Sequence, residues 1–220
     1  MENIGSDIVN NLGTTVLAVG ALGIAAFGIV EGFKGAGLGL LGFGQIPRLL
    51  GEHVLNALKI AYGDDYLSVL KVQYRTGRSS GDLTRSIRQG ARIGLTPSNA
   101  KDLAASVGVV DGEELRKVSE AVMAGEELND EQRGILGRFE LALDARIDAA
   151  TAMANYQYAN SMRVAASVVA VVIALIVAII VEANLLLALV VGIAAVPIAP
   201  IAKDVATAIQ SASAAMSRKK

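Results

Sequence analysis

Hydrophobic positions are concentrated in two blocks of the chain, residues 12–46 and 164–201, which a polar and charge-rich stretch separates. The second block is interrupted only by Glu182-Ala183-Asn184, and it contains two uncharged runs, VAASVVAVVIALIVAIIV and LLLALVVGIAAVPIAPI. Each run is close to the length, about 18 to 20 residues, at which a helix crosses the apolar core of a bilayer. Since a helix satisfies its own backbone hydrogen bonds where water is absent, the pattern predicts a transmembrane helical hairpin over 164–202.

The first block begins with a third apolar run, LGTTVLAVGALGIAAFGIV, at residues 12–30. No Lys or Arg precedes this run, whereas a signal peptide opens with basic residues, so we expect a retained transmembrane helix within an N-terminal segment 1–34. The glycines of this helix predict a face for close helix packing, and Gly28 and Gly32 have the small-xxx-small spacing. The expected packing residues are Gly20, Gly28 and Gly32, with Gly23 beside them.

The next stretch, GAGLGLLGFGQIPRLL at 35–50, is apolar but too short to span a bilayer before its polar residues. Gly37, Gly39 and Gly42 have the spacing of a dinucleotide-binding fingerprint, but that motif requires a preceding strand, and here a membrane helix precedes it. We expect a re-entrant or interfacial elbow, whose glycines either line a pore or make the segment flexible. If the segment did span, the chain would cross the membrane four times.

The polar stretch has apolar residues at helical spacing, which predicts a helical domain over 51–129. Its helices are expected at 52–75 with a break near Gly63, from Asp82, from the Thr96-Pro97 cap, and from Asp111 to Met123.

From Asp130 the sequence predicts one long helix, because neither proline nor a turn cluster follows before the membrane hairpin. Its apolar residues step by 3, 4, 4, 3, 4 and 4 positions, an 11-residue repeat that favours a straight or slightly right-handed helix. The helix would be about 52 residues and about 78 Å long. Its stalk, 130–163, needs partners for this stripe, either within the domain or from other copies of the chain. The stripe consists of Leu136, Phe139, Leu143, Ile147, Ala150, Ala154 and Tyr158.

These elements predict an all-α integral membrane protein, with three transmembrane helices and a cytoplasmic helical domain joined by a long continuous helix. Fifteen Lys and Arg residues lie between Arg48 and Arg163, four more lie in the basic tail 203–220, and none precedes Lys34. Because cytoplasmic segments carry the excess of basic residues, three spans would place the middle domain and the tail inside and the N-terminus outside. Four spans would place both termini inside.

Composition excludes several kinds of chemistry. The chain has no cysteine and one histidine, so it offers no disulfide, no thiolate nucleophile and no histidine cluster for a metal. We find no Walker loop, no Ser-His-Asp arrangement and no calcium-loop spacing. The sequence therefore predicts a protein that is not an enzyme, with no cofactor and no metal site.

The candidate ligand-binding residues are basic. Arg85, Arg88 and Arg92 fall on one face of a predicted helix, and Arg75 and Arg78 precede them. Such a cluster can hold anionic lipid headgroups or a phosphate ligand, while a nucleic-acid partner is not expected. The alternative is a solvated face that pairs with the acidic residues between 113 and 127.

A second candidate site concerns the ends of the predicted spans. Glu31 ends the first span, and Glu182 and Asn184 lie at the hairpin tip. If several copies surrounded an axis, such carboxylates could form a ring at the mouth of a cation pore; otherwise they are border and turn residues. Neither C-terminal run has an internal charge, which argues against a coupled transporter.

The leading functional hypothesis is therefore a homo-oligomeric membrane protein that forms an ion channel or pore. The alternative is a non-conducting anchor or scaffold, whose cytoplasmic domain binds a partner or anionic lipid. A third hypothesis is a sensor in which a phosphate ligand at the basic cluster opens the membrane part.

Overall fold

A computed structural model describes residues 2–33, 37–75 and 80–217, and every regular element within these ranges is a helix. The elements are α1 (Glu2–Gly32), η2 (Leu38–Leu40), α2 (Gln45–Leu50), α3 (Glu52–Tyr62), α4 (Tyr66–Arg75), α5 (Ser80–Ile93), α6 (Ala100–Val107), α7 (Gly112–Ala124), α8 (Asp130–Ile180) and α9 (Leu185–Ser217). The all-α prediction is confirmed, and so is the single long helix, which spans 51 residues.

The chain divides into two compact units, one formed by residues 39–158 and the other by residues 1–38 together with 159–220. The boundary falls inside α8, so one continuous helix contributes to both units. The first unit is larger than the domain predicted over 51–129, because it includes α2 and the N-terminal part of α8.

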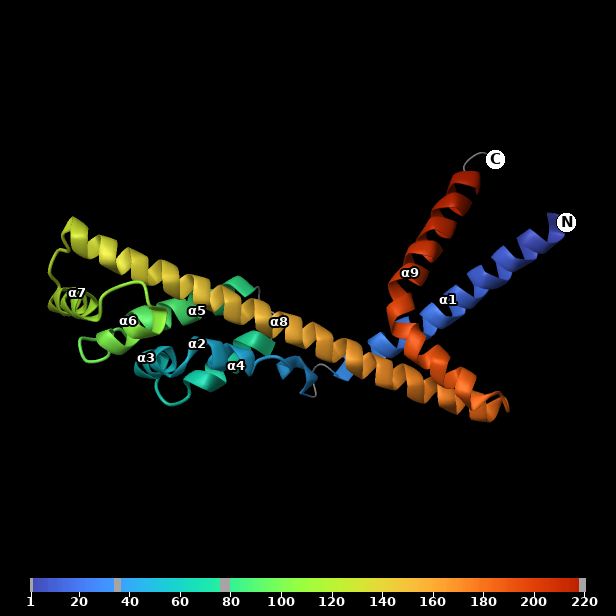
Figure 1. The fold of residues 1–220 in the computed structure, drawn as a ribbon, viewed down its shortest axis with the longest axis horizontal. Coiled ribbons are helices and arrows are strands. Elements are labelled where there is room, and N and C mark those ends of the chain that lie inside the picture. The colour runs from blue at the N-terminus through green and yellow to red at the C-terminus, as the bar shows by residue number, and fades with distance from the viewer. Residues whose placement is uncertain (1, 34–36, 76–79, 218–220) are drawn as a thin grey trace. The chain divides into compact units, whose positions relative to one another are not determined.

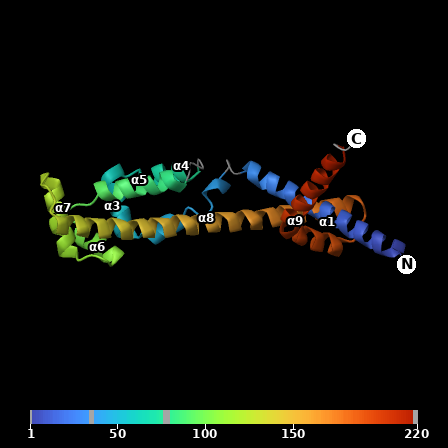
Figure 2. The ribbon, with the colours of Figure 1, turned by 90° about the horizontal axis from the view of Figure 1, so that it is seen from above.

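In the unit 39–158, helices α2 to α7 gather along the N-terminal part of α8, as Figures 1 and 2 show. The core follows the predicted stripe of α8: Phe139, Leu143, Ile147, Ala150 and Ala154 are all fully buried. These residues belong to one apolar cluster with buried residues of all the helices from α2 to α7. The partners that the stripe needs are therefore supplied within this chain.

The expected elbow at 35–50 takes a different form. From Gly39 onward it belongs to the helical unit, and its apolar side chains Phe43, Ile46 and Leu50 are buried in the core of that unit. The reason is that α2 places Ile46 and Leu50 one turn apart, on the face that joins the cluster. The prediction of an interfacial or re-entrant segment is thus replaced, for residues 39–50, by a core element.

Helix boundaries in the polar stretch agree closely with the sequence except at one start. The break near Gly63 is confirmed, since Gly63 ends α3 with a φ of 77° and α4 begins at Tyr66. The helix expected from Thr96-Pro97 begins instead at Ala100. Asn99 explains the difference: its side-chain oxygen accepts from the Thr96 N–H at 2.8 Å and its amide donates to the Gly94 carbonyl at 2.7 Å, which stabilises a turn before the helix.

Three helices are long and apolar enough to cross a membrane: α1 over Gly13–Gly32, α8 in its apolar part, and α9 over Leu185–Asp204. Only 22%, 22% and 33% of their most apolar windows are buried by the chain itself. Large apolar side chains such as Val168, Ile176 and Leu186 are more than half exposed. A surface of this kind is stable in lipid, whereas in water it would be a large apolar patch.

Helices α8 and α9 form a hairpin, as predicted, in which Gly192 of α9 lies against Val171 of α8. The last helix extends to Ser217, well beyond the predicted end of the hairpin at 202. Pro197 and Pro200 lie inside α9, and the helix bends in its middle (Figure 1). Proline causes such bends because its ring removes a backbone donor and clashes with the preceding turn.

Helix α1 packs against α9 through small residues. A Cβ on Gly20 would come within 2.0 Å of the Ala202 side chain, and one on Gly23 within 2.2 Å of the Ala195 carbonyl. The earlier glycine of α1 meets the later alanine of α9, and the later glycine meets the earlier alanine. The two helices are therefore antiparallel where they touch.

Candidate functional site

The basic face of α5 lies against α8 in part. Arg88 donates from Nε to the carboxylate of Asp144, and Arg92 Nε lies 2.9 Å from an oxygen of Glu140. Both acids are on α8, one turn apart, and they match the one-turn spacing of the two arginines. The expected acidic partners between 113 and 127 are therefore not the ones that neutralise these arginines.

The remaining residues of that predicted cluster are placed differently. Arg85, one turn before Arg88 on α5, is exposed, and Arg75 is exposed in the last turn of α4. Arg78 lies outside the described residues. Because two of the arginines are occupied by acids of the same chain, the face has less free positive charge than the sequence suggests.

The three candidate pore glycines differ in their surroundings. Gly37 has a φ of 120° and is exposed, whereas Gly39 is buried in η2. Gly42 has a φ of 92°, and a Cβ there would come within 2.2 Å of the Ala154 carbonyl oxygen of α8. Gly42 thus allows a backbone-to-backbone contact with α8.

Tyr74 holds this contact in place. Its hydroxyl lies 3.0 Å from the Leu41 carbonyl and 3.2 Å from the Ala154 carbonyl, so one side chain bridges the glycine segment and α8. Its ring meets Phe43 edge-on at 5.7 Å. Partial burial raises the pKa of Tyr74, which keeps the phenol protonated and able to donate.

Only part of the predicted packing face of α1 makes a contact within this chain, and that part includes Gly20. Gly28 and Gly32, which have the small-xxx-small spacing, have no atom of the described residues within 4 Å of a Cβ position. Gly20 and Gly23 carry the contact with α9 instead. Glycine spacing alone could not distinguish these pairs, because the face of α1 that meets α9 depends on where α9 lies.

The hairpin tip is built by Glu182 and Asn184. Glu182 has a φ of 54°, the only positive φ of a non-glycine residue in the described part of the chain, and its side chain is exposed. Asn184 caps α9: its side-chain oxygen accepts from the N–H groups of Leu186 at 2.9 Å and Leu187 at 3.2 Å. Asn184 is thus a helix cap, while Glu182 and, at the end of α1, Glu31 present exposed carboxylates.

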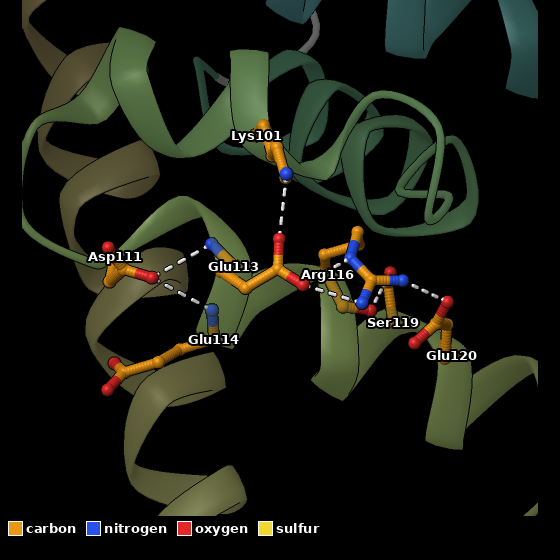
Figure 3. A network of polar contacts seen from close by, with 7 residues as sticks. All are labelled: Lys101, Asp111, Glu113, Glu114, Arg116, Ser119 and Glu120. Carbon is orange, nitrogen blue, oxygen red and sulfur yellow. Dashed lines mark hydrogen bonds and ion pairs between the residues drawn. The ribbon is translucent and has the colours of Figure 1, made fainter.

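A polar network that the sequence does not predict joins α6 to α7 (Figure 3). Glu113 accepts from Arg116 at 2.6 and 2.8 Å and pairs with Lys101 at 2.7 Å, and Arg116 also pairs with Glu120. The hydrogen bonds from Arg116 and Lys101 lower the pKa of Glu113 to about 2. Asp111 caps α7 through the N–H groups of Glu113 and Glu114. The network links α6 to α7, and its side chains are partly exposed to solvent.

Arg146 is a second residue that sequence reasoning missed. It lies on α8 between two buried core residues, and its Nε donates to the Leu49 carbonyl at 2.7 Å while Nη1 donates to the Ser106 carbonyl. These carbonyls lie near the ends of α2 and α6, where helical carbonyls lack partners. A cation within an apolar stripe is the signal that could have identified it.

No group of three or more His, Cys, Asp or Glu side chains that could hold a metal occurs among the described residues. Comparison with known proteins finds no matching family model, no matching curated sequence and no matching solved structure. The geometry of the residues is therefore what indicates a function.

Proposed function

We propose that this chain is an integral membrane anchor that holds the helical unit 39–158 at the cytoplasmic face of a bilayer, where the unit docks a partner. The composition of α8 carries the proposal. Its N-terminal part supplies the buried core of the helical unit, and its C-terminal part is an uncharged apolar run with exposed side chains. The fifteen Lys and Arg residues between Arg48 and Arg163 support the cytoplasmic side for that unit.

An anchor explains the glycine segment better than a pore does. Of the pore candidates, Gly42 is in contact with α8 and Gly39 is buried. The apolar runs of α8 and α9 also contain no ionisable residue that could line an ion path or relay a proton.

A homo-oligomeric pore is the second candidate, and the free face of α1 favours it. Gly28 and Gly32 are exposed and uncovered, so a helix from another copy could approach them closely. A ring of copies would also bring the exposed Glu182 carboxylates together.

The contact between α1 and α9 bears on the orientation. Three complete spans would make these helices parallel, but Gly20 and Gly23 meet α9 in antiparallel order. We therefore propose the α8–α9 hairpin as the spanning anchor, with both chain ends on the cytoplasmic side. The charge pattern with three spans favours an external N-terminus, whereas the two-helix anchor places the N-terminus on the cytoplasmic side. The two topologies therefore predict opposite sides for the N-terminus.

The absence of cysteine makes a clean test possible, because every introduced thiol is the only one. We would place His53→Cys in the helical unit, Glu182→Cys at the tip, or Ser6→Cys near the start of α1. Sealed vesicles of known sidedness would then be treated with a membrane-impermeant maleimide. The proposal expects the thiols introduced at positions 53 and 6 to react from one side, and the thiol at position 182 from the other. Reaction of the thiols at positions 53 and 182 from the same side would contradict the anchor.

Ion flux separates the two candidate functions. Vesicles with the purified chain should show no cation flux above empty vesicles if it is an anchor. A cation flux would establish the pore instead if Glu182→Gln reduces it and the control Glu114→Gln, in the helical unit, leaves it unchanged.

A further inference from the structure

A groove of about 550 Å³ lies among α1, α8 and α9. Its walls are apolar and come from all three helices: Phe27, Val164, Val168, Val196, Pro197 and Pro200. The polar residues that line it are Arg163 and Ser167, both on α8. The groove lies where α9 contains its two prolines, so the bend of α9 is next to it.

Among the described residues that line this groove, Arg163 is the only charged one, and it is exposed. Among the described residues, no carboxylate forms an ion pair with its guanidinium. The Ser167 hydroxyl donates its hydrogen to the Arg163 carbonyl at 3.0 Å, a bond within α8, so this hydrogen is not available to a ligand in the groove. A guanidinium stays protonated at every physiological pH and binds phosphate through two parallel N–H groups.

The position of Arg163 along α8 gives the groove a polar end and an apolar end. Arg163 is the last charged residue before the uncharged run that begins at Val164, which is where a headgroup region would meet the apolar core. Val168 lies further into that run, and Phe27 lies within the apolar part of α1. A ligand that fits has one anionic group and an extended apolar chain.

A second groove shows why the charge matters. Its volume is about 340 Å³, and it lies near the hairpin tip. The described residues that line it include Leu22, Ile173, Val177 and Asn184, and none of them is charged. That groove can accommodate an acyl chain, yet it has nothing that distinguishes an anionic lipid from a neutral one.

We infer that the groove at Arg163 binds one anionic phospholipid, with the phosphate on the guanidinium and an acyl chain along Val168, Val196 and Phe27. Basic pockets between membrane helices on the cytoplasmic side are suited to such headgroups. This inference rests on the proposed membrane anchor, and it adds a specific lipid to it. The site is distinct from the basic face of α5, where Asp144 and Glu140 pair with two of the arginines.

The absence of tryptophan provides a fluorescent test on the full chain. Phe27→Trp places one reporter in the groove, and Ile29→Trp places a control on an exposed position of the same helix. Each variant would be reconstituted in phosphatidylcholine vesicles with increasing brominated phosphatidylglycerol or brominated phosphatidylcholine, which quench on contact. We expect the anionic lipid to half-quench the reporter at position 27 at about a five-fold lower mole fraction than the neutral lipid, the selectivity that one basic side chain near the surface provides.

Arg163→Gln should remove this preference at position 27, whereas Arg138→Gln, on an exposed position of α8 in the helical unit, should leave it unchanged. The control reporter at position 29 should show no preference. Equal quenching at position 27 by both lipids would overturn the site but leave the membrane anchor standing. Quenching of neither reporter by either lipid would overturn membrane insertion itself.

Two further arms keep the inference testable. Millimolar inorganic phosphate should not reduce the preference, and loss of the preference would show a phosphate site rather than a lipid site. If Phe27→Trp does not fold, native mass spectrometry of the unlabelled protein replaces it. There the wild type should retain one phosphatidylglycerol that Arg163→Gln loses, and equal retention by both proteins would contradict the inference.

Discussion

The two parts of α8 bury side chains of different size. In the helical unit, the buried face carries the large side chains of Phe139, Leu143 and Ile147, followed by Ala150 and Ala154, while the large Leu141 is 72% exposed. In the second unit the relation is reversed. The buried face there carries an alanine every fourth residue, while valines and isoleucines of the same helix are about half exposed. The buried alanines are Ala166, Ala170, Ala174 and Ala178.

On the proposed membrane anchor, this difference corresponds to a change of solvent along one helix, from water to lipid. In water, burial of large apolar groups drives packing, so they are found inside. In lipid, the surroundings are as apolar as the side chains, and helices associate by the close approach of small residues instead. Gly23 against Ala195 and Gly192 against Val171 follow the second rule, as the alanine stripe does.

The largest expected effect comes from removing a core side chain of the helical unit 39–158. Phe139→Ala should destabilise the helical unit by about 3–5 kcal/mol, since Phe139 is fully buried and its loss leaves a cavity. Leu141→Ala is the matched control on the same helix and should stay within about 0.5 kcal/mol. Chemical denaturation followed by the fluorescence of the tyrosines in this unit would measure both. Similar costs for the two variants would contradict the assigned core.

Next in size is a change in the glycine segment. Gly42→Ala should lower the free energy of unfolding by about 1–3 kcal/mol through backbone strain at φ 92°. The clash of the added Cβ with the Ala154 carbonyl should lower it further. Gly44→Ala is the control, because Gly44 has a φ of −57° and open space around its Cβ position. The same denaturation experiment applies. A Gly42→Ala protein as stable as Gly44→Ala would show that this segment does not contact α8.

The small-residue contact of the second unit should be broken by adding a side chain rather than by removing one. Gly23→Val places a Cβ against the Ala195 carbonyl and should separate α1 from α9, while Gly28→Val meets open space. Ala26→Cys, at a position fully buried in the native contact, reports the separation. We expect Gly23→Val to raise maleimide labelling of this thiol in mild detergent about ten-fold, the factor that corresponds to about 1–2 kcal/mol of helix association. Equal labelling in the two valine variants would refute the contact.

The smallest expected effect is electrostatic and is confined to the α6–α7 network. The folded-state pKa of Glu113 is about 2, below its ordinary value of 4.5, so its contribution to stability is complete above pH 4.5 and is lost as the pH falls toward 2. Glu113→Gln should remove that part of the pH dependence, and high salt should weaken it because the network is exposed. Glu114→Gln is the control, as the Glu114 side chain points away from the network in Figure 3. Thermal melts between pH 2 and 6 would measure it, and parallel pH profiles of the two variants would exclude the assigned role.

Local patterns predicted the parts of this fold that depend on one helix at a time. The extent of α8, its stripe and the break at Gly63 follow from periodicity and from a turn residue, and the structure has them where the sequence places them. The start of α6 was not predicted correctly from the Thr96-Pro97 pattern, because the Asn99 side chain forms hydrogen bonds with Thr96 and Gly94 in the preceding turn.

Features that depend on two helices were not predictable in the same way. Arg88 and Arg92 are one turn apart on α5, but their partners Asp144 and Glu140 lie on α8, near in space and distant in sequence. Likewise, the choice of Gly20 and Gly23 over Gly28 and Gly32 depends on the course of α9. The groove at Arg163 needs three helices at once, so no single segment indicates it.

The change of solvent along α8 is the central claim, and two exposed positions on that helix test it most directly. Leu141→Cys and Val172→Cys, at residues 72% and 49% exposed, would each be reconstituted in vesicles as the only thiol of the chain. The account predicts that a water-soluble maleimide labels the thiol at position 141 rapidly from the side on which the helical unit lies. It labels the thiol at position 172 only after the bilayer is dissolved and the protein denatured. Rapid labelling at position 172 in intact vesicles would contradict the account, because it would place the alanine-striped half of α8 in water.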